Sequence, residues 1–319
     1  MSQQSLPGLW MAGPLAPDLV ARIEPQYKIH RGWEVKDVPA YLREHGAGIR
    51  GIATSGRFGA RRALIESLPA LEAIISYGVG YDPIDIDAAR ERGVVVSNTP
   101  GVLDACVADT ALALLLSVSR RICEADRYVR GGHWPQQGNF ALGHSMNGKR
   151  CGIVGLGGIG LQIAIRAEAF GMTISYHNRR ARADAPAHYD YAASVRDLAR
   201  DSDYLVLAIP GGNATKHLIN AEVLQALGAD GYLINVARGT VVDEQALIQA
   251  LQAGTIAGAG LDVFEHEPEV PTALRELDQV VLLPHIGSGT HETRQAMADL
   301  FIENLQAWFG EKRLVTQVV

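Results

Sequence analysis

Three side chains in the second half of the chain could act together on a carbonyl group. Arg238 follows an apolar run at 232–236, Glu267 precedes a proline, and His285 follows a Leu-Pro pair. An arginine offers a planar fork for a carboxylate, a histidine titrates near neutral pH, and a neighbouring carboxylate favours the charged imidazole. Reduction of a 2-oxo acid requires such a set. A cation must bind the carboxylate of the acid and polarise its ketone, a second group must donate a proton, and a carboxylate must orient that donor.

Rival side chains leave each of these assignments open when only the residues are considered. Arg238 could instead form a surface ion pair. Side chains of the same types lie close by along the chain: His266 and His291 compete with His285, and Glu265 and Glu269 compete with Glu267. Spacing alone does not choose among them.

A glycine-rich stretch at mid-chain, Gly155-Leu156-Gly157-Gly158-Ile159-Gly160, predicts a dinucleotide site. An apolar run precedes it and a helix-like segment follows, which is the context that the motif requires. Gly155 allows a tight turn, Gly157 lets a diphosphate approach the backbone, and Gly160 lets helix and strand pack closely. The amides from Gly157 to Ile159 would receive the phosphates at a helix N-terminus. A glycine-rich turn without a ligand is the alternative.

The residues after the next apolar run indicate which dinucleotide binds. An NAD site usually has an acidic residue there, whereas this chain has Asn178, Arg179 and Arg180. The two arginines could bind a ribose 2′-phosphate through charge-assisted hydrogen bonds. The sequence therefore favours NADPH over NADH, with NADH still possible.

Strands alternating with helices predict an α/β fold of doubly wound parallel sheets. Strands are expected at 9–12, 27–30, 51–54, 71–76, 94–98, 149–154, 173–176, 204–209, 232–236, 257–264 and 279–283. Helices are expected at 61–67, 104–119, 161–170, 195–200, 244–253 (with Asp243 as N-cap) and 291–309.

Because the glycine motif begins past residue 150, the nucleotide domain is expected to be the second one. We expect a first domain at 1–98, completed by 288–319, and a nucleotide domain at 99–287. The nearly continuous apolar helix at 104–119 suggests burial between domains. Residues 131–147 are expected to form a long irregular segment. Segments of this kind are usually functional or packed on a partner.

Composition excludes several classes of protein. With 47% hydrophobic and 20% charged residues, the chain resembles a soluble globular protein. A net charge of −6 argues against a nucleic-acid partner. Cys106, Cys123 and Cys151 have no CxxC spacing, so no metal site is expected. We expect a cytoplasmic protein, because no signal peptide or apolar run of membrane-spanning length is visible.

The motifs together resemble the D-2-hydroxyacid dehydrogenase family over essentially the whole chain. The matching stretches are 76–82 (SYGVGYD), 98–101 (NTPG), 155–160 (GLGGIG), 235–239 (NVARG), 260–268 (GLDVFEHEP) and 284–288 (PHIGS). The resemblance implies that Arg238, Glu267 and His285 are the catalytic set. It also implies a flavodoxin-like substrate domain and a Rossmann domain with a cleft between them.

The same resemblance implies roles for residues that spacing does not identify. The main-chain N–H groups of Val79 and Gly80 would bind the substrate carboxylate. Asp262 would contact the nicotinamide carboxamide, and Thr110 and Ala237 would line the cofactor site.

Within the family the chain looks most like reductases that use NADPH to reduce glyoxylate and hydroxypyruvate. In similar reductases an aromatic side chain of the partner subunit reaches the substrate, and Trp134 is the candidate here, in a homodimer. Two alternatives are an NAD-linked enzyme acting on D-lactate, phosphoglycerate or an aromatic 2-oxo acid, and a nucleotide-sensing regulatory protein. The intact Arg238–Glu267–His285 set does not exclude a regulator, although no extra segment for recruiting a partner is visible.

Overall fold

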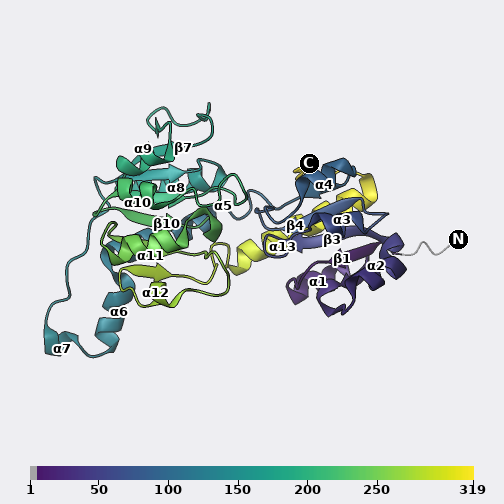
Figure 1. Cartoon of the computed structure of the whole chain (residues 1–319), viewed down its shortest axis with the longest axis horizontal. Coiled ribbons are helices and arrows are strands. Elements are labelled where there is room, and N and C mark those ends of the chain that lie inside the picture. Colours follow the sequence, from purple (N-terminus) through teal and green to yellow (C-terminus); the bar gives the residue numbers. More distant parts are fainter. Residues whose placement is uncertain (1–5) are drawn as a thin grey trace. The chain divides into compact units, whose positions relative to one another are not determined.

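The computed structural model describes residues 6–319 and separates into two compact units (Figure 1). The larger unit is Asp104–Gly289, and the smaller unit joins the residues up to Leu103 with Thr290–Val319. The changeovers thus lie at 103/104 and 289/290, where the sequence suggested 98/99 and 287/288. Each unit is described by itself.

The larger unit is built on a seven-stranded sheet in which every neighbouring pair is parallel. Its strands are β6 (Arg150–Val154), β7 (Thr173–His177), β8 (Asp190–Tyr191), β9 (Tyr204–Leu207), β10 (Tyr232–Asn235), β11 (Gly258–Leu261) and β12 (Val280–Leu282). Their order is β12-β11-β10-β9-β6-β7-β8. Counted from β6, six of these strands follow the 3-2-1-4-5-6 order of dinucleotide-binding sheets, and β12 adds a seventh.

Helices cover both faces of this sheet. The helices are α5 (Asp104–Arg120), α6 (Ile122–Arg130), α7 (Trp134–Gln137), α8 (Gly158–Ala169), α9 (Val195–Arg200), α10 (Ala221–Leu227), α11 (Glu244–Gln252) and α12 (Thr272–Arg275). α5 and α8 contact each other, whereas α9, α10 and α11 contact one another in succession. Leu198, Leu224 and Leu251 pack from the second group against buried Leu205 and Leu233 of the sheet.

The sequence predicted some elements correctly and misjudged others. α9 has the predicted bounds, and Asp243 caps α11 by accepting a hydrogen bond from the Ala246 amide. β11 ends at Leu261, so the prediction of a strand to residue 264 is wrong. Val263 and Phe264 are buried, but their backbone has left the sheet. Apolarity there indicated burial and not strand pairing.

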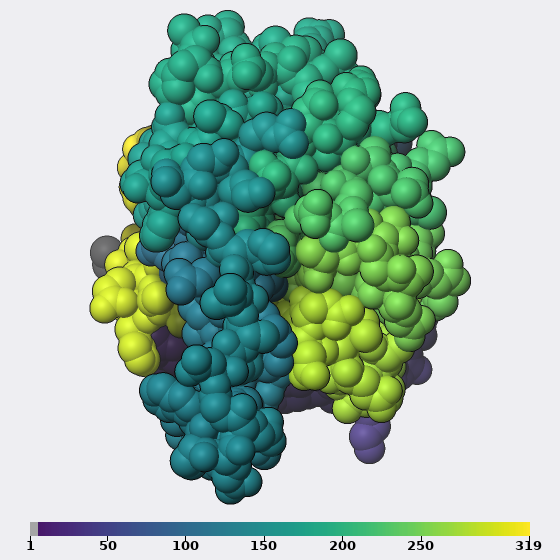
Figure 2. All heavy atoms as spheres, turned by 90° about the vertical axis from the view of Figure 1, so that its left-hand side faces the viewer, coloured from purple at the N-terminus to yellow at the C-terminus, as the bar shows by residue number. Residues whose placement is uncertain are grey.

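An arm made of α6 and α7 extends from the body of the larger unit (Figure 1), and dark teal atoms mark it in Figure 2. The segment 131–147 was expected to be irregular, yet it contains α7. Tyr128 holds the arm together, since its ring packs 5.3 Å from that of Phe140 and its hydroxyl donates to the Gly138 carbonyl at 3.0 Å.

The smaller unit has a five-stranded parallel sheet of order β2-β1-β3-β4-β5, the flavodoxin-like order. Its strands are β1 (Gly8–Met11), β2 (Lys28–Arg31), β3 (Ile49–Ser55), β4 (Ala73–Tyr77) and β5 (Val95–Ser97). Its helices are α1 (Pro17–Ile23), α2 (Val38–His45), α3 (Arg62–Glu66), α4 (Ile86–Glu91) and α13 (His291–Glu311). α13 contacts β4 and buries Phe301 and Leu305 in the same core as Leu19 of α1.

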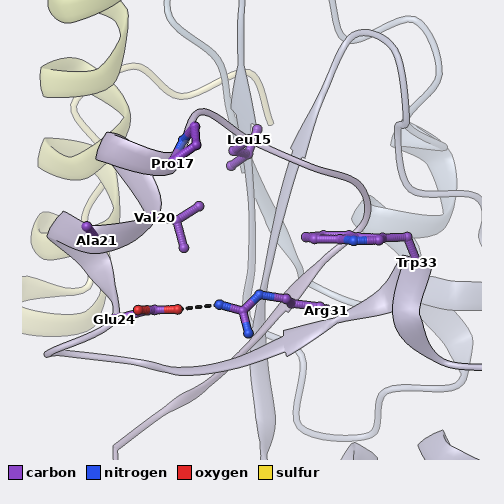
Figure 3. Close-up of a pocket in the computed structure, with 7 residues that line it drawn as sticks. All are labelled: Leu15, Pro17, Val20, Ala21, Glu24, Arg31 and Trp33. Atoms are coloured by element: carbon purple, nitrogen blue, oxygen red, sulfur yellow. Dashed lines mark hydrogen bonds and ion pairs between the residues drawn. The ribbon is translucent and has the colours of Figure 1, made fainter.

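A pocket of about 300 Å³ lies beside α1, where Trp33 and the aliphatic part of α1 line it (Figure 3). The charged groups in its lining, Arg31 and Glu24, pair with each other at 2.5 Å. The pocket contains none of the residues that the sequence singled out, and it has no histidine, serine or cysteine in its lining.

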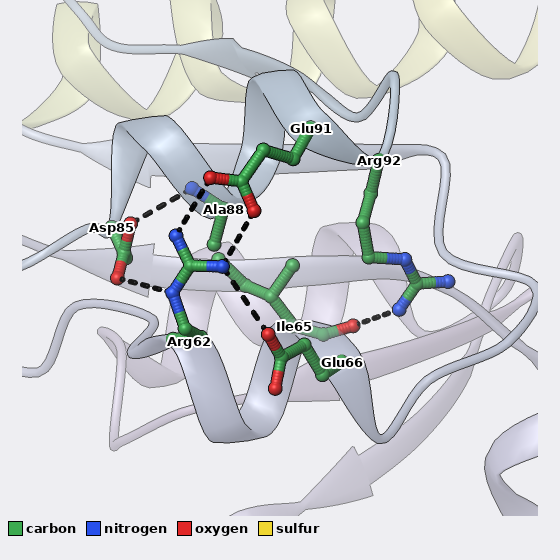
Figure 4. A network of polar contacts seen from close by, with 7 residues as sticks. All are labelled: Arg62, Ile65, Glu66, Asp85, Ala88, Glu91 and Arg92. Carbon is green, nitrogen blue, oxygen red and sulfur yellow. Dashed lines mark hydrogen bonds and ion pairs between the residues drawn. The ribbon is translucent and has the colours of Figure 1, made fainter.

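A polar network joins α3 to α4 (Figure 4). Arg62 holds both carboxylate oxygens of Glu91, at 2.6 and 3.1 Å, and reaches Glu66 and Asp85 at 3.3 and 3.5 Å. Asp85 also caps α4 through the Ala88 amide. Because the arginine is exposed, we assign this network a small share of the unit's stability.

Candidate active site

The structure pairs His285 with Glu267. Nδ1 of His285 lies 2.8 Å from Oε2 of Glu267. Both residues follow neighbouring strands, because Glu267 lies after β11 and His285 after β12, and Leu261 and Leu282 are partners in the register of those strands. The parallel strands therefore bring the two loops to one edge of the sheet.

Glu267 is held in its charged form. Burial alone would raise the pKa of its carboxyl, but three favourable interactions outweigh burial and leave the pKa below its ordinary value. These are the contact with His285, a 3.2 Å hydrogen bond from the Phe264 amide to Oε1, and the charge of Arg238. The side chain is therefore an anion at neutral pH and can orient the imidazole of His285 through their hydrogen bond.

Asp262 fixes the backbone that carries His285. Its two carboxylate oxygens accept hydrogen bonds from the amides of Ile286 and Gly287, each at 2.7 Å, and its carbonyl accepts from the His285 amide at 2.9 Å. The side chain is almost fully buried, and this burial raises the pKa of its carboxyl against the effect of the two amides. His285 itself has a left-handed backbone, with φ +55°. The acid expected near the nicotinamide thus also positions the histidine loop.

Arg238 follows β10 on a loop that packs against the glutamate loop. Asn235 shapes this loop, because its side chain accepts from the Ala237 amide and donates to the Arg238 carbonyl, both at 3.0 Å. A Cβ on Gly239 would lie 1.8 Å from the carbonyl carbon of Phe264, so only glycine permits this approach. Arg238 is consequently near enough for its charge to favour ionised Glu267.

The rival residues have other surroundings. Glu265 pairs with His217 at 2.9 Å, and His266 forms an isolated bridge with Glu269. His291 is the first residue of α13 in the smaller unit. The geometry therefore favours the Glu267–His285 pair among the possibilities that spacing left open.

The glycine motif forms the turn from β6 into α8, with Gly157 as the N-cap. Gly155 has φ +100°, and a Cβ on Gly160 would lie 2.0 Å from the Gly155 carbonyl oxygen. A Cβ on Gly157 would meet no atom within 4 Å. The turn thus has open space beside Gly157, as a diphosphate requires, whereas a Cβ on Gly158 would lie 2.1 Å from Oδ2 of Asp104.

The loop after β7 carries three arginines with different surroundings. Arg179 and Arg180 are exposed and have no ion-pair partner among residues 6–319. Arg182 pairs with Asp184 at 2.6 Å and donates to the Leu156 carbonyl at 3.0 Å. Asn178 also belongs to this connection, because its side chain accepts from the Leu156 amide at 2.8 Å.

Arg182, which links the arginine loop to the glycine turn, was not predicted from the sequence. The basic run Arg179–Arg182, in which it is the last residue, could have indicated it. Arg182 therefore positions the loop, whereas Arg179 and Arg180 are the cations available to a phosphate.

The remaining predicted residues lie as follows. The Thr110 hydroxyl, on α5, is within hydrogen-bond distance of the Cys106 and Gly287 carbonyls, at 3.2 and 3.4 Å. Trp134 is 59% exposed at the start of α7. Among the described residues, no group of three or more histidine, cysteine, aspartate or glutamate side chains could hold a metal ion. No helix within residues 6–319 has the length and apolarity to cross a membrane.

Val79 and Gly80 form a loop after β4 in the smaller unit. Gly78, with φ +123°, donates to the Thr99 hydroxyl at 3.0 Å, and the Asn98 side chain donates to the Val79 carbonyl at 2.8 Å. The amides of Val79 and Gly80 have no acceptor in the part of the chain that the structure describes. This loop can therefore offer two N–H groups to an anion.

Comparisons with known proteins agree on one family. Residues 112–287 match the model of the D-isomer specific 2-hydroxyacid dehydrogenase, NAD binding domain. A glyoxylate/hydroxypyruvate reductase of Arabidopsis thaliana is 47% identical over 98% of this chain and 99% of its own length. A hydroxyphenylpyruvate reductase of Plectranthus scutellarioides is 48% identical over the same shares.

A solved structure is similar over the whole chain as well. It is an NADPH-dependent glyoxylate/hydroxypyruvate reductase of Sinorhizobium meliloti in complex with NADP and malonate, with a TM-score of 0.92 and 42% identity. The match covers 99% of this chain and 97% of that one.

Proposed function

The chain belongs to the D-isomer specific 2-hydroxyacid dehydrogenase family, and from this premise we propose that it reduces small 2-oxo acids, foremost glyoxylate and hydroxypyruvate, with NADPH. The observation that carries this proposal is the 2.8 Å pair of His285 and Glu267 beside the Arg238 loop. The larger unit would bind the dinucleotide and the smaller unit the substrate.

The chemistry follows from the side chains. A nicotinamide dinucleotide supplies a hydride when it is bound. Arg238 holds the carboxylate of the 2-oxo acid and polarises its ketone, and the Val79 and Gly80 amides donate to the same carboxylate. His285, oriented by anionic Glu267, gives its proton to the ketone oxygen as that oxygen gains negative charge.

The turn from β6 into α8 is suited to the cofactor's diphosphate. Gly157, Gly158 and Ile159 offer amides, and there is open space beside Gly157, while Gly155 and Gly160 have no room for a side chain. Asp262, Thr110 and Ala237 would lie near the nicotinamide. Asp262 is already fixed by two amides, yet a carboxylate has further lone pairs for another donor.

A preference for NADPH is supported by exposed Arg179 and Arg180, which face no carboxylate among residues 6–319. Replacing both with alanine should lower the ratio of kcat/KM for NADPH to that for NADH by about tenfold or more for each lost contact. Arg200→Ala, which removes an exposed arginine already paired with Asp197, is the matched control. An unchanged ratio in the double variant would contradict this part of the proposal.

The experiment that tests the activity follows NADPH oxidation with glyoxylate, hydroxypyruvate, pyruvate and 4-hydroxyphenylpyruvate. We expect turnover with the first two. A regulatory protein would bind NADPH but oxidise it with none of the four acids.

Aromatic 2-oxo acids are the second candidate substrates. The support is the hydroxyphenylpyruvate reductase, which is as similar to this chain as the glyoxylate/hydroxypyruvate reductase. A higher kcat/KM for 4-hydroxyphenylpyruvate than for hydroxypyruvate would favour this candidate.

We also propose that the protein is a homodimer formed through the α6–α7 arm. Ile122, Val129 and Trp134 are exposed apolar side chains of this arm, and a groove of about 560 Å³ lies along α5 and α6. Trp134 would enter the partner's substrate pocket.

Val129→Asp should convert the dimer to a monomer in sedimentation analysis. A wild-type protein that sediments as a monomer would refute the proposed homodimer. The cytoplasmic location of the protein stays a prediction.

A further inference from the structure

His217 connects the two loops to which the proposed function assigns Arg238 and Glu267. Its amide donates to the Thr240 carbonyl at 2.9 Å. Its ring nitrogen Nε2 lies 2.9 Å from Oε1 of Glu265. Thr240 comes two residues after Arg238, and Glu265 comes two residues before Glu267. One residue therefore ties both catalytic loops, with its backbone on one and its side chain on the other.

The backbone of His217 is held in a conformation that fixes the direction of its ring. Its φ is +52°, in the left-handed region that residues with a Cβ seldom adopt. Two hydrogen bonds just beyond it keep the segment in place: the Ile219 amide donates to the Val241 carbonyl at 3.0 Å, and the Asp243 amide donates to the Ile219 carbonyl at 2.9 Å. An unfavourable conformation held by its surroundings in this way often serves a functional site.

The backbone of Glu265, whose side chain His217 contacts, is confined from two further sides. Gly239 packs against the Phe264–Glu265 peptide, and the Glu265 amide points at Oε2 of Glu244 at 3.4 Å. The Glu265 side chain is only 17% exposed, so its charge needs a partner. Burial raises the pKa of Glu244, and the nearby Glu265 carboxylate acts in the same direction. The imidazole of His217 is the hydrogen-bond partner that the structure gives to the Glu265 carboxylate.

We propose that His217 is a positioning residue: through Glu265 it holds the segment 264–267 so that Glu267 stays within hydrogen-bond distance of His285. This inference rests on the proposed function. Without the His217–Glu265 contact, Glu267 would lie near His285 for less of the time. Because a carboxylate beside an imidazole favours the protonated ring, turnover should then fall most on the alkaline side.

The test compares variants in the pH dependence of kcat for glyoxylate reduction, with KM for NADPH and Tm measured alongside. His217→Ala removes the ring, whereas His217→Gln keeps a donor that can reach Glu265. Both variants place a residue with a Cβ at the same left-handed backbone position, so strain there does not distinguish them. His188→Ala is the matched control, because His188 pairs with Glu168 at 2.6 Å in the same unit, far along the chain from both catalytic loops. The wild-type protein is assayed first, so failure of the proposed function shows as absence of activity there.

With an active wild type, we expect His217→Ala to lower kcat about tenfold at pH 8 and less at pH 6. KM for NADPH should stay within about twofold of the wild-type value, as should every parameter of His188→Ala. His217→Gln should recover most of kcat. A pH profile of His217→Ala that coincides with that of His188→Ala would overturn the inference. A loss in His217→Gln as large as that in His217→Ala would overturn it equally.

Discussion

At the scale of single residues, one ring nitrogen of His285 lies within hydrogen-bond distance of Glu267. The other ring nitrogen has no hydrogen-bond partner among residues 6–319. That arrangement leaves one nitrogen to donate a proton. His285→Gln should lower kcat by a factor on the order of 10²–10⁴, the range for a lost general acid. Binding of NADPH, followed by its fluorescence, should be nearly unchanged. Turnover close to that of the wild type would show that another group supplies the proton.

The depressed pKa of Glu267 predicts how stability depends on pH. A carboxyl whose pKa is lower in the folded than in the unfolded chain stabilises the fold above the unfolded value of about 4.3, and this contribution is lost as the pH falls through the folded value. Glu267→Gln should therefore lower Tm by about 2–4 °C near pH 5.5, and the difference should shrink below about pH 4. A difference that persists unchanged at pH 3 would indicate lost packing and not lost charge.

The residues of the candidate site could be predicted unequally from the sequence. Spacing could not separate Glu267 from Glu265, because side chains that close together along a loop differ in direction and not in position. It could not separate His285 from His266, because the loops after neighbouring parallel strands reach the same edge of the sheet. The resemblance to a family separated them. Neither approach found His217, since its link to Glu265 spans 48 residues and depends on a left-handed backbone.

At the scale of elements, the turn from β6 into α8 makes opposite predictions for two of its glycines. A methyl group on Gly160 would collide with the Gly155 carbonyl, whereas one on Gly157 would enter open space. Gly160→Ala should therefore destabilise the unit by about 1–3 kcal/mol, as overpacking does. Gly157→Ala should keep its Tm and raise KM for NADPH. Thermal unfolding and steady-state kinetics of the two variants measure both effects, and equal Tm values would contradict the packing account.

Elements with strong patterns were predictable, and several short ones were not. α5 was predicted within one residue, because its long apolar run can be accommodated only in a buried helix. α4 and α6, of six and nine residues, were missed, although α9 and α11 have the same lengths and were predicted, so length alone does not decide. β9 and β11 were predicted too long, because apolar residues continue past the last paired residue of each strand.

At the scale of the whole molecule, the two sheets are formed by different parts of the chain. The smaller unit takes its strands from the first hundred residues and its last helix from the C-terminus, and α13 packs on β4. The sequence predicted such a return from the position of the final helix after the last strand. It could not give the order of strands in either sheet, because strand order depends on tertiary packing.

The most direct test of the central claim uses NADPH that carries deuterium at the transferred position of its nicotinamide. Hydroxypyruvate is reduced by the wild-type protein and by His285→Gln, and the product is examined by mass spectrometry and chiral chromatography. We predict that the wild-type product is a D-2-hydroxy acid with deuterium on C2, formed at a rate that the variant does not approach. A product without deuterium, an L-2-hydroxy acid, or equal rates for the two proteins would contradict the account.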